Sequence, residues 1–574
     1  MATLSTMPET TLHGLDRFSS RARAALAHAL EQDPESILLE VPRDETHGEF
    51  SFPCFQMAKA SGETPPALAA RLAAELEIEA MQTEVVGPFL NFRIDPTPLA
   101  AAILEGALAS DYGKGEQNET TVLEFSSPNI AKPMHVGHLR STVIGAALAR
   151  ILTRLGHKVT RINHLGDWGS QFGRLVAAWR RWGNEEAFAA HPIEHLLELY
   201  VRFHDEEEKD PTLMEEAKAA FGELETGEDG DSRRLWKRFT EASLLEFDKI
   251  YARLGIEFEH IRGESWYEDR LEGLVEWLDA RGVLEESDGA QIVDLTAQGM
   301  DTPCLVKTAL GTTLYATRDL AAARSRWEEF SFDHSLYVVG SEQELHFRQF
   351  KAVLDRCGED WAARIEHIPF GLIRMAEGKL STREGKVLLL SKVLDRACEL
   401  AMETIADKNP DLADREAVAE QVGLGAVIFH DLKHQRQKDV VFDWKEVLSF
   451  EGDTGPYLQY THARCCSILR KAASPNIAFQ DVDPSLLADS PELMVALGRY
   501  PAAIREAGNR REPSALAQAL LRIASAGNAF YRDRRVLGCG DEALERARLA
   551  AVAALRNTLA DGLGLLGVPA PEEM

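Results

Sequence analysis

Two histidines, His135 and His138, stand where a predicted strand gives way to a predicted helix. Residues 122–125 have the length and the bounding turn residues of a buried strand. From residue 138 apolar side chains recur every four residues as far as Leu155, and a glycine then ends the helix. Two imidazoles one helical turn apart can donate hydrogen bonds to phosphate oxygens, and Gly137 between them lets an adenine ring approach the backbone. Such a junction binds nucleotides in open α/β sheets, and a chance match of four residues is the alternative.

Two other predicted strands also end in polar residues. A short strand at 159–163 leads into a run dense in glycine and polar side chains at 163–173. A core strand at 335–340 leads into the polar segment 341–346. Because nucleotides and their partners bind at the carboxyl ends of parallel strands, we expect these segments to face a ligand together with the histidines. A tight turn followed by a helix cap is the alternative for residues 163–173.

The C-terminal part of the chain combines aromatic and basic side chains. From residue 456 onwards nearly every segment is predicted to be helical, and Tyr457, Tyr460 and Arg464 lie at its start. A helical bundle of this kind can stack and clamp single-stranded bases. A bundle with ordinary core tyrosines and a solvated arginine face is the alternative. A basic, glycine-flanked loop, residues 379–386, precedes these helices.

The remaining segments predict an N-terminal α+β unit, a long helical insertion and a few further strands. Helices are expected through residues 15–30, from Thr64 onwards, after Pro98 and through 191–254. Strands are expected at 37–41, 85–94, 290–295 and 304–317, the last with a turn at Gly311.

Composition describes a large globular protein. The chain has 574 residues, of which 45% are hydrophobic and 27% charged, and its length suggests about four domains. The net charge of −29 argues against indiscriminate nucleic-acid binding, but a local basic face can still bind RNA. No apolar run approaches a membrane span and no secretory signal is visible, so we expect a cytoplasmic protein without a membrane partner. The seven cysteines are scattered without a Cys-x-x-Cys pair, so we expect reduced thiols and no structural metal.

Several long strings resemble the arginyl-tRNA synthetases, a class I aminoacyl-tRNA synthetase family, and the resemblance runs nearly end to end. The string SSPNIAKPMHVGHLRST is similar to that family's His-Ile-Gly-His signature, and NHLGDWGSQFG, YATRDL, SEQELH and TGPYLQYTHAR resemble its other blocks. The resemblance implies a multidomain α/β fold with a Rossmann-type (HUP-type) parallel sheet in its catalytic domain. It also implies the following division: residues 1–112, an N-terminal α+β domain for the outer corner of tRNA; 118–370, the catalytic domain with a helical insertion at about 185–285; 371–452, the second signature and a stem-contact region; and 453–574, an all-α anticodon-binding bundle.

The resemblance also implies the reaction. The carboxylate of L-arginine attacks the α-phosphate of Mg-ATP and releases pyrophosphate, and the arginyl group then passes from arginyl-adenylate to tRNA(Arg), releasing AMP. Such chemistry depends mostly on positioning and electrostatic stabilisation. His135 and His138 are expected to steady the α-phosphate, with Gly137 in the ATP site. A monomer is typical of the family, and tRNA is expected on Tyr457, Tyr460 and Arg464.

Arginine selection has a physical basis, because a planar guanidinium prefers bidentate carboxylate partners. By resemblance Glu124 and Asp319 bind the guanidinium and Tyr315 packs on it. The amino and carboxylate end of arginine is expected at Ser126, Asn129, His135 and Gln343. The alternative for Glu124 is a buried ion pair with a protein arginine such as Arg140 or Arg318, and the alternative for Asp319 is a helix N-cap.

The family's second signature departs from its usual form here. Lys-Met-Ser-Lys-Ser appears as Lys-Leu-Ser-Thr-Arg at residues 379–383, so Thr382 stands where a second lysine is expected. A cation is still needed for the leaving pyrophosphate, and the resemblance implies that Lys132 supplies it. The rest of the ATP site is expected to include Lys379, Ser381 and Arg383.

Two other functions stay open. One is a different His-x-Gly-His nucleotidyltransferase or synthetase, acting on cysteine or a pantothenate-like acid, although the chain offers no zinc-ligand cluster for cysteine and has a large C-terminal bundle. The other is a synthetase-like RNA-binding protein that has lost activation, although His135, Gly137, His138, Glu124 and Asp319 are all intact. Arginine-dependent ATP–pyrophosphate exchange, with and without tRNA, separates these functions.

Overall fold

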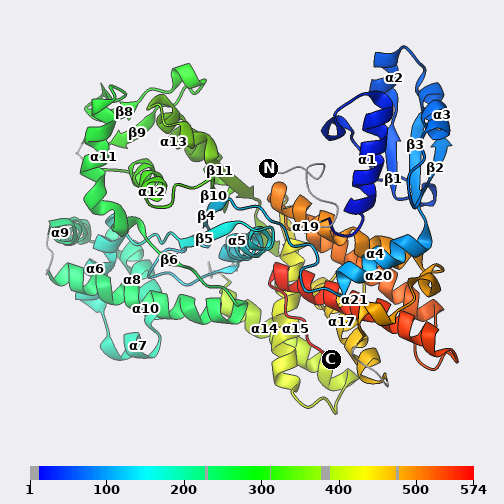
Figure 1. Ribbon diagram of the computed structural model, residues 1–574. Coiled ribbons are helices and arrows are strands. Elements are labelled where there is room, and N and C mark those ends of the chain that lie inside the picture. Colours follow the sequence, from blue (N-terminus) through cyan, green and yellow to red (C-terminus); the bar gives the residue numbers. More distant parts are fainter. Residues whose placement is uncertain (1–11, 227–229, 310–311, 376–387, 473–476) are drawn as a thin grey trace.

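The middle of the chain folds around a parallel sheet of five strands (Figure 1). The computed structural model describes all residues except 1–11, 227–229, 310–311, 376–387 and 473–476. In chain order the strands are β4 (Thr120–Glu124), β5 (Lys158–Asn163), β6 (His260–Ile261), β10 (His334–Gly340) and β11 (Ile365–Phe370). Their order in the sheet is β11-β10-β4-β5-β6. After β4 the chain adds β5 and β6 on one side of it, and it later adds β10 and β11 on the other side. The carboxyl ends of β4 and β10 are therefore a topological switch point.

The strands predicted at 122–125, 159–163 and 335–340 are confirmed as β4, β5 and β10. Val122 and Leu123 face opposite sides of the sheet, and both are buried. Helices cover both faces of a parallel sheet, so such a strand is a continuous apolar run rather than an alternating one.

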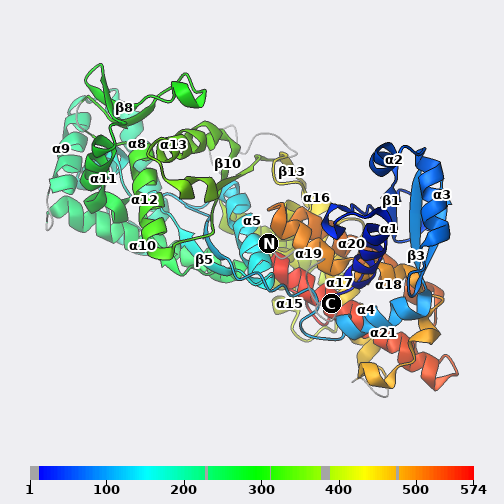
Figure 2. The same cartoon turned by 45° about the horizontal axis from the view of Figure 1, so that its top comes forward.

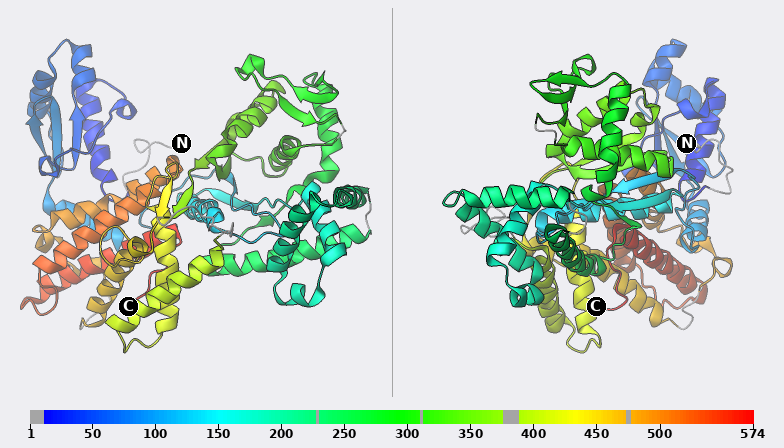
Figure 3. Two further views of the ribbon diagram at one scale, coloured as in Figure 1. Left: turned by 180° about the vertical axis from the view of Figure 1, so that it is seen from behind. Right: turned by 90° about the vertical axis from the view of Figure 1, so that its left-hand side faces the viewer.

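Helix α5 (Val136–Arg154) follows β4, as predicted, and begins two residues earlier than expected. It packs against β4, β5 and β10 on one side and against α21 (Glu542–Leu566) of the C-terminal bundle on the other (Figures 1 and 3). Burial on two sides explains why this helix is apolar over most of its surface instead of along one stripe. It thus joins the parallel sheet to the bundle.

The expected insertion is mostly helical and forms the end of the molecule farthest from the N-terminal unit (Figure 2). Its helices, with the one that precedes them, are α6 (Ser170–Trp182), α7 (Glu185–Ala190), α8 (Pro192–Glu207), α9 (Thr212–Thr226), α10 (Asp231–Leu254) and α11 (Glu268–Ala280). Strand β6 interrupts this stretch and pairs with β5, with His260 opposite Ile162. Residues 185–285 are therefore not a purely helical insertion.

A small antiparallel sheet follows. Its elements and the two helices after it are β7 (Glu285–Ser287), β8 (Ala290–Val293), β9 (Cys304–Lys307), α12 (Tyr315–Phe330) and α13 (Glu344–Arg356). The prediction at 290–295 is confirmed by β8, but the one at 304–317 is only half right. After β9 a single bridge joins Thr313 to Lys307, and the helix starts at Tyr315. The expected turn residue Gly311 lies outside the described residues.

The N-terminal unit is an antiparallel sheet with helices. Its elements are α1 (Asp16–Leu30), β1 (Phe50–Pro53), α2 (Phe55–Ser61), α3 (Pro65–Glu75), β2 (Met81–Val86), β3 (Phe89–Ile94) and α4 (Pro96–Ala107). One prediction here is wrong and another is half right. The strand expected at 37–41 is a single bridge between Glu40 and Ser51. The strand expected at 85–94 is the turn and second half of a hairpin, because Gly87 (φ +57°) reverses the chain.

The rest of the chain is a helical bundle on which the N-terminal unit rests through α4 (Figures 1 and 3). Besides α21, this region contains β12 (Ile373–Met375), α14 (Leu390–Lys408), α15 (Arg415–Leu432), β13 (Val440–Phe442), α16 (Trp444–Val447), α17 (Gly455–Arg470), α18 (Pro491–Gly498), α19 (Tyr500–Asn509) and α20 (Ser514–Asp533). Helix α21 is long and apolar enough to cross a membrane, but 72% of its apolar window is buried, which is typical of a core helix.

Candidate active site

The two histidines cap the amino-terminal end of α5. His135 is the N-cap residue, and its Nδ1 accepts a hydrogen bond from the backbone N–H of Gly137 at 3.0 Å. The Nδ1 of His138 accepts from the backbone N–H of His135 at 3.0 Å. Each imidazole thus satisfies one of the N–H groups that a helix start leaves unpaired. The two rings lie close together, with centroids 3.9 Å apart and planes tilted by 40°.

This cap fixes the protonation of both rings. Because each Nδ1 accepts a hydrogen bond, the ring proton sits on Nε2. Burial lowers the pKa of His135, and burial together with the neighbouring His135 ring lowers the pKa of His138 to about 3. Both rings are therefore neutral at pH 7, and each presents an Nε2–H donor. They can bind phosphate oxygens through hydrogen bonds, but not through a positive charge.

Gly137 is needed by the histidine beside it. A Cβ at this position would lie 2.7 Å from Cε1 and 2.8 Å from Nδ1 of the His135 ring. Separations under 3.0 Å force something to shift, and here the ring would lose its bond to the helix start. The approach of an adenine ring stays a prediction. The ring contact gives this glycine a structural reason that needs no ligand.

The chain that follows residues 376–387 lies against the same helix start. Leu389 forms an antiparallel bridge with His135, and the N–H of Leu390 donates to the carbonyl of Met134 at 2.9 Å. The chain that follows the second signature therefore lies against the start of α5, beside His135. The predicted ATP contacts within it lie outside the described residues: Lys379, Ser381 and Arg383.

Lys132 points toward the helical insertion. Its Nζ lies 4.7 Å from the centre of the Tyr200 ring on α8, a cation–π contact. This contact was not foreseen, because Tyr200 is far along the chain. The role of Lys132 toward pyrophosphate stays a prediction, and it requires the side chain to exchange the aromatic ring for a phosphate.

Glu124 forms a buried ion pair with Arg326 of α12, at 2.6 Å between Oε2 and Nη2. The two side chains are 8% and 1% exposed, and two charges this deep require each other. A buried ion pair with a protein arginine was the alternative role for Glu124, although the sequence did not identify Arg326 as the partner. The arginines named there pair elsewhere: Arg140 with Asp431 and Arg318 with Glu268. Glu124 therefore adds no net negative charge to the site.

Asp319 faces two histidines at the carboxyl end of the sheet. Its Oδ2 lies 2.5 Å from Nε2 of His346, the histidine that follows β10, and its Oδ1 lies 3.9 Å from Nε2 of His164 after β5. The N-cap of α12 is Leu314, so the alternative role of Asp319 as a helix cap is excluded. The carboxylate is 27% exposed and can accept hydrogen bonds from a cation.

Glu264 was missed in the sequence and lies beside Asp319. It opens the short helix η4 (Glu264–Tyr267), and its backbone N–H donates to the carbonyl of Leu165 at 3.0 Å. Burial, with a smaller contribution from the neighbouring Asp319, raises the pKa of its carboxyl to about 8. A perturbed carboxyl in this position is a functional candidate. The two-residue strand before it gave no sequence signal.

Ser126 belongs to the scaffold. Its hydroxyl lies 2.8 Å from the hydroxyl of Tyr251 and 2.9 Å from Oγ1 of Thr142, and the residue is 5% exposed. Its backbone N–H also bonds to Ser141 at 2.9 Å. The hydroxyl is thus already bonded inside the fold, and the contact of Ser126 with arginine stays a prediction.

The other predicted arginine contacts lie at the same edge of the sheet but are open to solvent. Asn129 is exposed, and its backbone bridges to Gly166 in the loop after β5. Gln343 ends the short helix η6 (Ser341–Gln343) after β10 and is also exposed. Tyr315 is 70% exposed at the start of α12, so it is not yet packed over a pocket.

The predicted tRNA contacts share one face of α17. Tyr457 receives a hydrogen bond from Asn528 of α20 at 2.8 Å, whereas Tyr460 is 47% exposed. The guanidinium of Arg464 lies 4.4 Å from the centre of the Tyr531 ring. An exposed tyrosine beside an arginine on an aromatic ring is a surface that bases can stack on.

Within the described ranges, no three His, Cys, Asp or Glu side chains are arranged to hold a metal ion. All seven cysteines are free thiols.

Three family descriptions match the chain one after another. "Arginyl tRNA synthetase N terminal domain" matches residues 16–94, "tRNA synthetases class I (R), catalytic domain" matches 101–444, and "DALR anticodon binding domain" matches 458–574. The catalytic match contains the parallel sheet and both histidines, and the DALR match contains α17 to α21 almost entirely.

Whole-length relatives agree with these matches. An arginine–tRNA ligase of Enterococcus faecalis is 46% identical over 559 residues, covering 96% of this chain and 98% of the relative. The ligase of Latilactobacillus sakei is 45% identical, also over 96% and 98%. The solved arginyl-tRNA synthetase of Thermus thermophilus superposes with a TM-score of 0.82 at 28% identity, covering 97% of this chain and all of that one. The chain belongs to the arginyl-tRNA synthetase family.

Proposed function

We propose that this arginine–tRNA ligase activates arginine at the switch point of its sheet, with ATP held at the start of α5 and the guanidinium held at Asp319. The enzyme joins L-arginine to tRNA(Arg) in two steps, through arginyl-adenylate. The main support for this proposal is the contact between Asp319 and His346, which brings α12 to the carboxyl end of β10. Strand β10 pairs with β4, the strand that leads to His135 and His138.

Activation begins with attack of an arginine carboxylate oxygen on the α-phosphorus. The bond from that phosphorus to the bridging oxygen breaks, and pyrophosphate leaves. The Nε2–H groups of His135 and His138, together with the helix start, bind the phosphate oxygens on which charge grows. Mg²⁺ enters as part of the ATP substrate. The β- and γ-phosphates of ATP are bound by Lys132, Lys379, Ser381 and Arg383.

Arginine is selected by charge. Asp319 binds the guanidinium and gives up its contact with His346. The carboxyl of Glu264 lies beside Asp319. The buried pair of Glu124 and Arg326 closes the floor of the site without adding net charge. Asn129, His135 and Gln343 bind the amino and carboxylate groups, and Tyr315 folds over the bound side chain.

The arginyl group then passes to tRNA(Arg), which lies across the C-terminal bundle and the N-terminal unit. Tyr457, Tyr460 and Arg464 contact the anticodon side. A cleft of about 710 Å³ between the two units is lined by three arginines (Arg93, Arg499 and Arg522) and by three glutamates, one of which pairs with Arg499. The enzyme acts as a cytoplasmic monomer.

Arginine-dependent exchange of pyrophosphate into ATP, measured with and without tRNA(Arg), tests this function. Asp319→Asn is expected to raise the KM for arginine roughly 10- to 100-fold, because a hydrogen bond to a charged group contributes about 1.5–3 kcal/mol. The KM for ATP is expected to change little. Asp355→Asn, the same chemical change at an exposed position of α13, serves as the matched control.

Three results contradict the proposal in different ways. A parallel rise in both KM values assigns Asp319 a structural role. Exchange supported by cysteine or a pantothenate-like acid, and not by arginine, identifies a different nucleotidyltransferase. The absence of exchange with every amino acid tested identifies an RNA-binding protein that has lost activation.

A further inference from the structure

Arg436, in the segment after α15, bonds to two separate parts of the molecule. Its Nε donates to the carbonyl of Arg511 at 3.0 Å, and its backbone N–H donates to the carboxylate of Glu512 at 3.2 Å. Its Nη1 donates to the carbonyl of Pro369 at 2.6 Å. One half-buried arginine therefore ties the end of α19, in the bundle, to the end of β11, in the parallel sheet.

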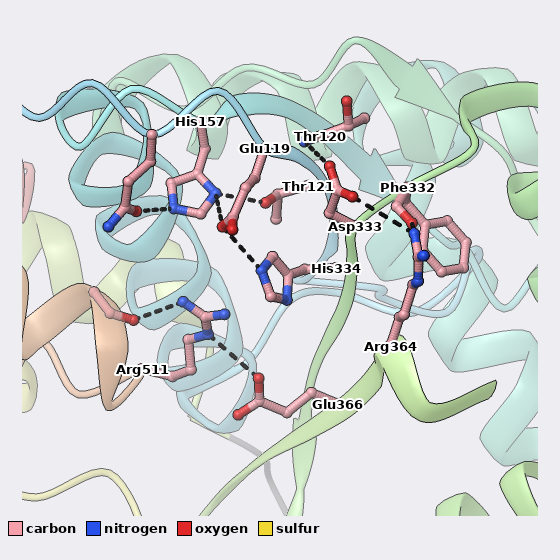
Figure 4. Close-up of polar contacts among 12 residues, drawn as sticks. Glu119, Thr120, Thr121, His157, Phe332, Asp333, His334, Arg364, Glu366 and Arg511 are labelled. Carbon is pink, nitrogen blue, oxygen red and sulfur yellow. Dashed lines mark hydrogen bonds and ion pairs between the residues drawn. The ribbon is translucent and has the colours of Figure 1, made fainter. Parts of the chain in front are cut away.

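The end of α19 is itself held rigidly against the sheet. Arg511 has a φ of +52°, a left-handed conformation that is uncommon for a residue with a Cβ. Its buried guanidinium donates to the carbonyl of Gly508 at 2.7 Å and to Glu366 of β11 at 3.3 Å (Figure 4). Because these contacts fix the backbone of Arg511, its carbonyl cannot turn away from Arg436 independently. A shift of α19 must move Arg436 or break its bonds.

From Arg436 the contacts continue to the start of α5. The N–H of Gly371 donates to the carbonyl of Arg436 at 2.9 Å, and the carbonyl of Gly371 accepts from Nη1 of Arg140 at 2.9 Å. A Cβ at Gly371 would lie 2.7 Å from the backbone of Lys438, so this crossing is tightly packed. Arg140 is 1% exposed and lies on α5 just after His138. The path from the bundle to α5 is thus a continuous series of buried and half-buried hydrogen bonds.

We propose that Arg436 is a positioning residue through which tRNA bound on the C-terminal bundle sets the alignment of α5, and with it the rate of arginine activation. The inference rests on the proposed function, since it takes tRNA(Arg) as the molecule on the bundle. Arg436 acts through Gly371 and Arg140 on the histidines. Its loss therefore changes how fast activation proceeds, and leaves the affinities for arginine, ATP and tRNA nearly unchanged.

The test measures arginine-dependent pyrophosphate exchange as a function of tRNA(Arg) concentration. Arg436→Gln cannot reach both carbonyls, so the maximal rate is expected to fall about tenfold, while half-saturating tRNA and both KM values stay within about twofold. Arg436→Lys keeps one donor and is expected to give an intermediate rate. Glu512→Ala removes the carboxylate contact on the other side of the same junction and is expected to lower the maximal rate as well. The double variant is expected to be no slower than the slower single one, because both act through one path.

Arg396→Gln is the matched control, since Arg396 is a half-exposed arginine of α14 that pairs with Glu399 on the surface. Thermal unfolding of each variant separates misfolding from slow activation, and if Arg436→Gln does not fold, Glu512→Ala decides. A rise in half-saturating tRNA at an unchanged maximal rate makes Arg436 a tRNA contact and overturns the inference. Unchanged rates in both variants also overturn it. Absence of exchange in the unaltered enzyme refutes the proposed function instead.

Discussion

The two ends of helix α5 are built differently. At its amino-terminal end two neutral rings cap the backbone and keep an Nε2–H each for a ligand. At its carboxyl-terminal end Arg154 donates to Asp561 of α21 at 2.9 Å, and the same carboxylate accepts from the buried hydroxyl of Tyr500 at 2.6 Å. Arg154 also bonds to the carbonyl of Tyr112, in the link from the N-terminal unit. One helix thus joins a site that keeps free donors for a ligand to a junction of groups that bond to one another.

This difference separates chemistry from stability along a single element. Unused donors at the first end cost some stability and are available to a substrate, whereas the bonded groups at the second end attach three parts of the chain to one another. Substitutions at the first end are therefore expected to change rate, and those at the second end to change the free energy of unfolding. The predictions below test that separation.

The largest expected effect is on His138. Asparagine can keep the hydrogen bond to the N–H of His135 through its side-chain oxygen, but it cannot place a donor where Nε2–H stands. His138→Asn is expected to lower the maximal exchange rate by roughly 10²- to 10³-fold, the usual cost of losing one preorganised donor. The melting temperature is expected to stay close to that of the unaltered enzyme. A large loss of stability at normal rate would refute the division between the two ends.

At the other end, Asp561→Ala leaves the buried hydroxyl of Tyr500 without its acceptor. An unsatisfied buried polar group costs about 1–3 kcal/mol, so the free energy of unfolding measured in urea is expected to fall by that amount. Asp561→Asn keeps an acceptor oxygen and is expected to cost less. KM values for arginine and ATP are expected to remain unchanged in both, and a shift in either KM at full stability would count against the comparison.

Gly137→Ala sharpens the contrast, because the exchange rate is expected to fall while the free energy of unfolding changes little. The added Cβ would lie 2.7 Å from the His135 ring and force it out of its cap, so the exchange rate is expected to fall about tenfold, on the scale of a misplaced catalytic group. Replacing glycine by alanine inside a helix favours folding by about 0.5–1 kcal/mol, which offsets the lost cap bond. Exchange kinetics and urea unfolding of the same variant measure both quantities.

The amino-terminal end of α5 was predictable from sequence because its information is local. The strand, the two histidines and the periodic helix lie within one continuous stretch, and the structure places them as expected. The carboxyl-terminal end was not predictable. Arg154 and Asp561 are 407 positions apart, and nothing near either residue in the sequence identifies the other.

The two carboxylates of the candidate site follow the same rule. Sequence placed Glu124 and Asp319 in one layer, but it could not choose between a ligand and a protein partner, because Arg326 reaches Glu124 only when α12 packs on β4. The missed hairpin at β2 and β3 is a different case. Gly87 is followed by Pro88, and a Gly-Pro pair marks a turn. The hairpin was therefore predictable from a local signal to which too little weight was given.

Acidification tests the neutral state of His138 directly. The pKa of His138 is lowered to about 3 in the folded enzyme, against about 6.5 in an unfolded chain. Between these values the unfolded chain binds a proton that the folded one does not, so this residue's contribution to stability is complete above pH 6.5 and is lost as the pH falls toward 3. His138→Asn is expected to remove a slope of up to about 1.4 kcal/mol per pH unit from the free energy of unfolding in this window. Urea unfolding of the enzyme and the variant at several pH values measures that slope. Equal slopes would mean that His138 is already charged in the folded state, and the two ends of α5 would then differ less than their hydrogen bonds indicate.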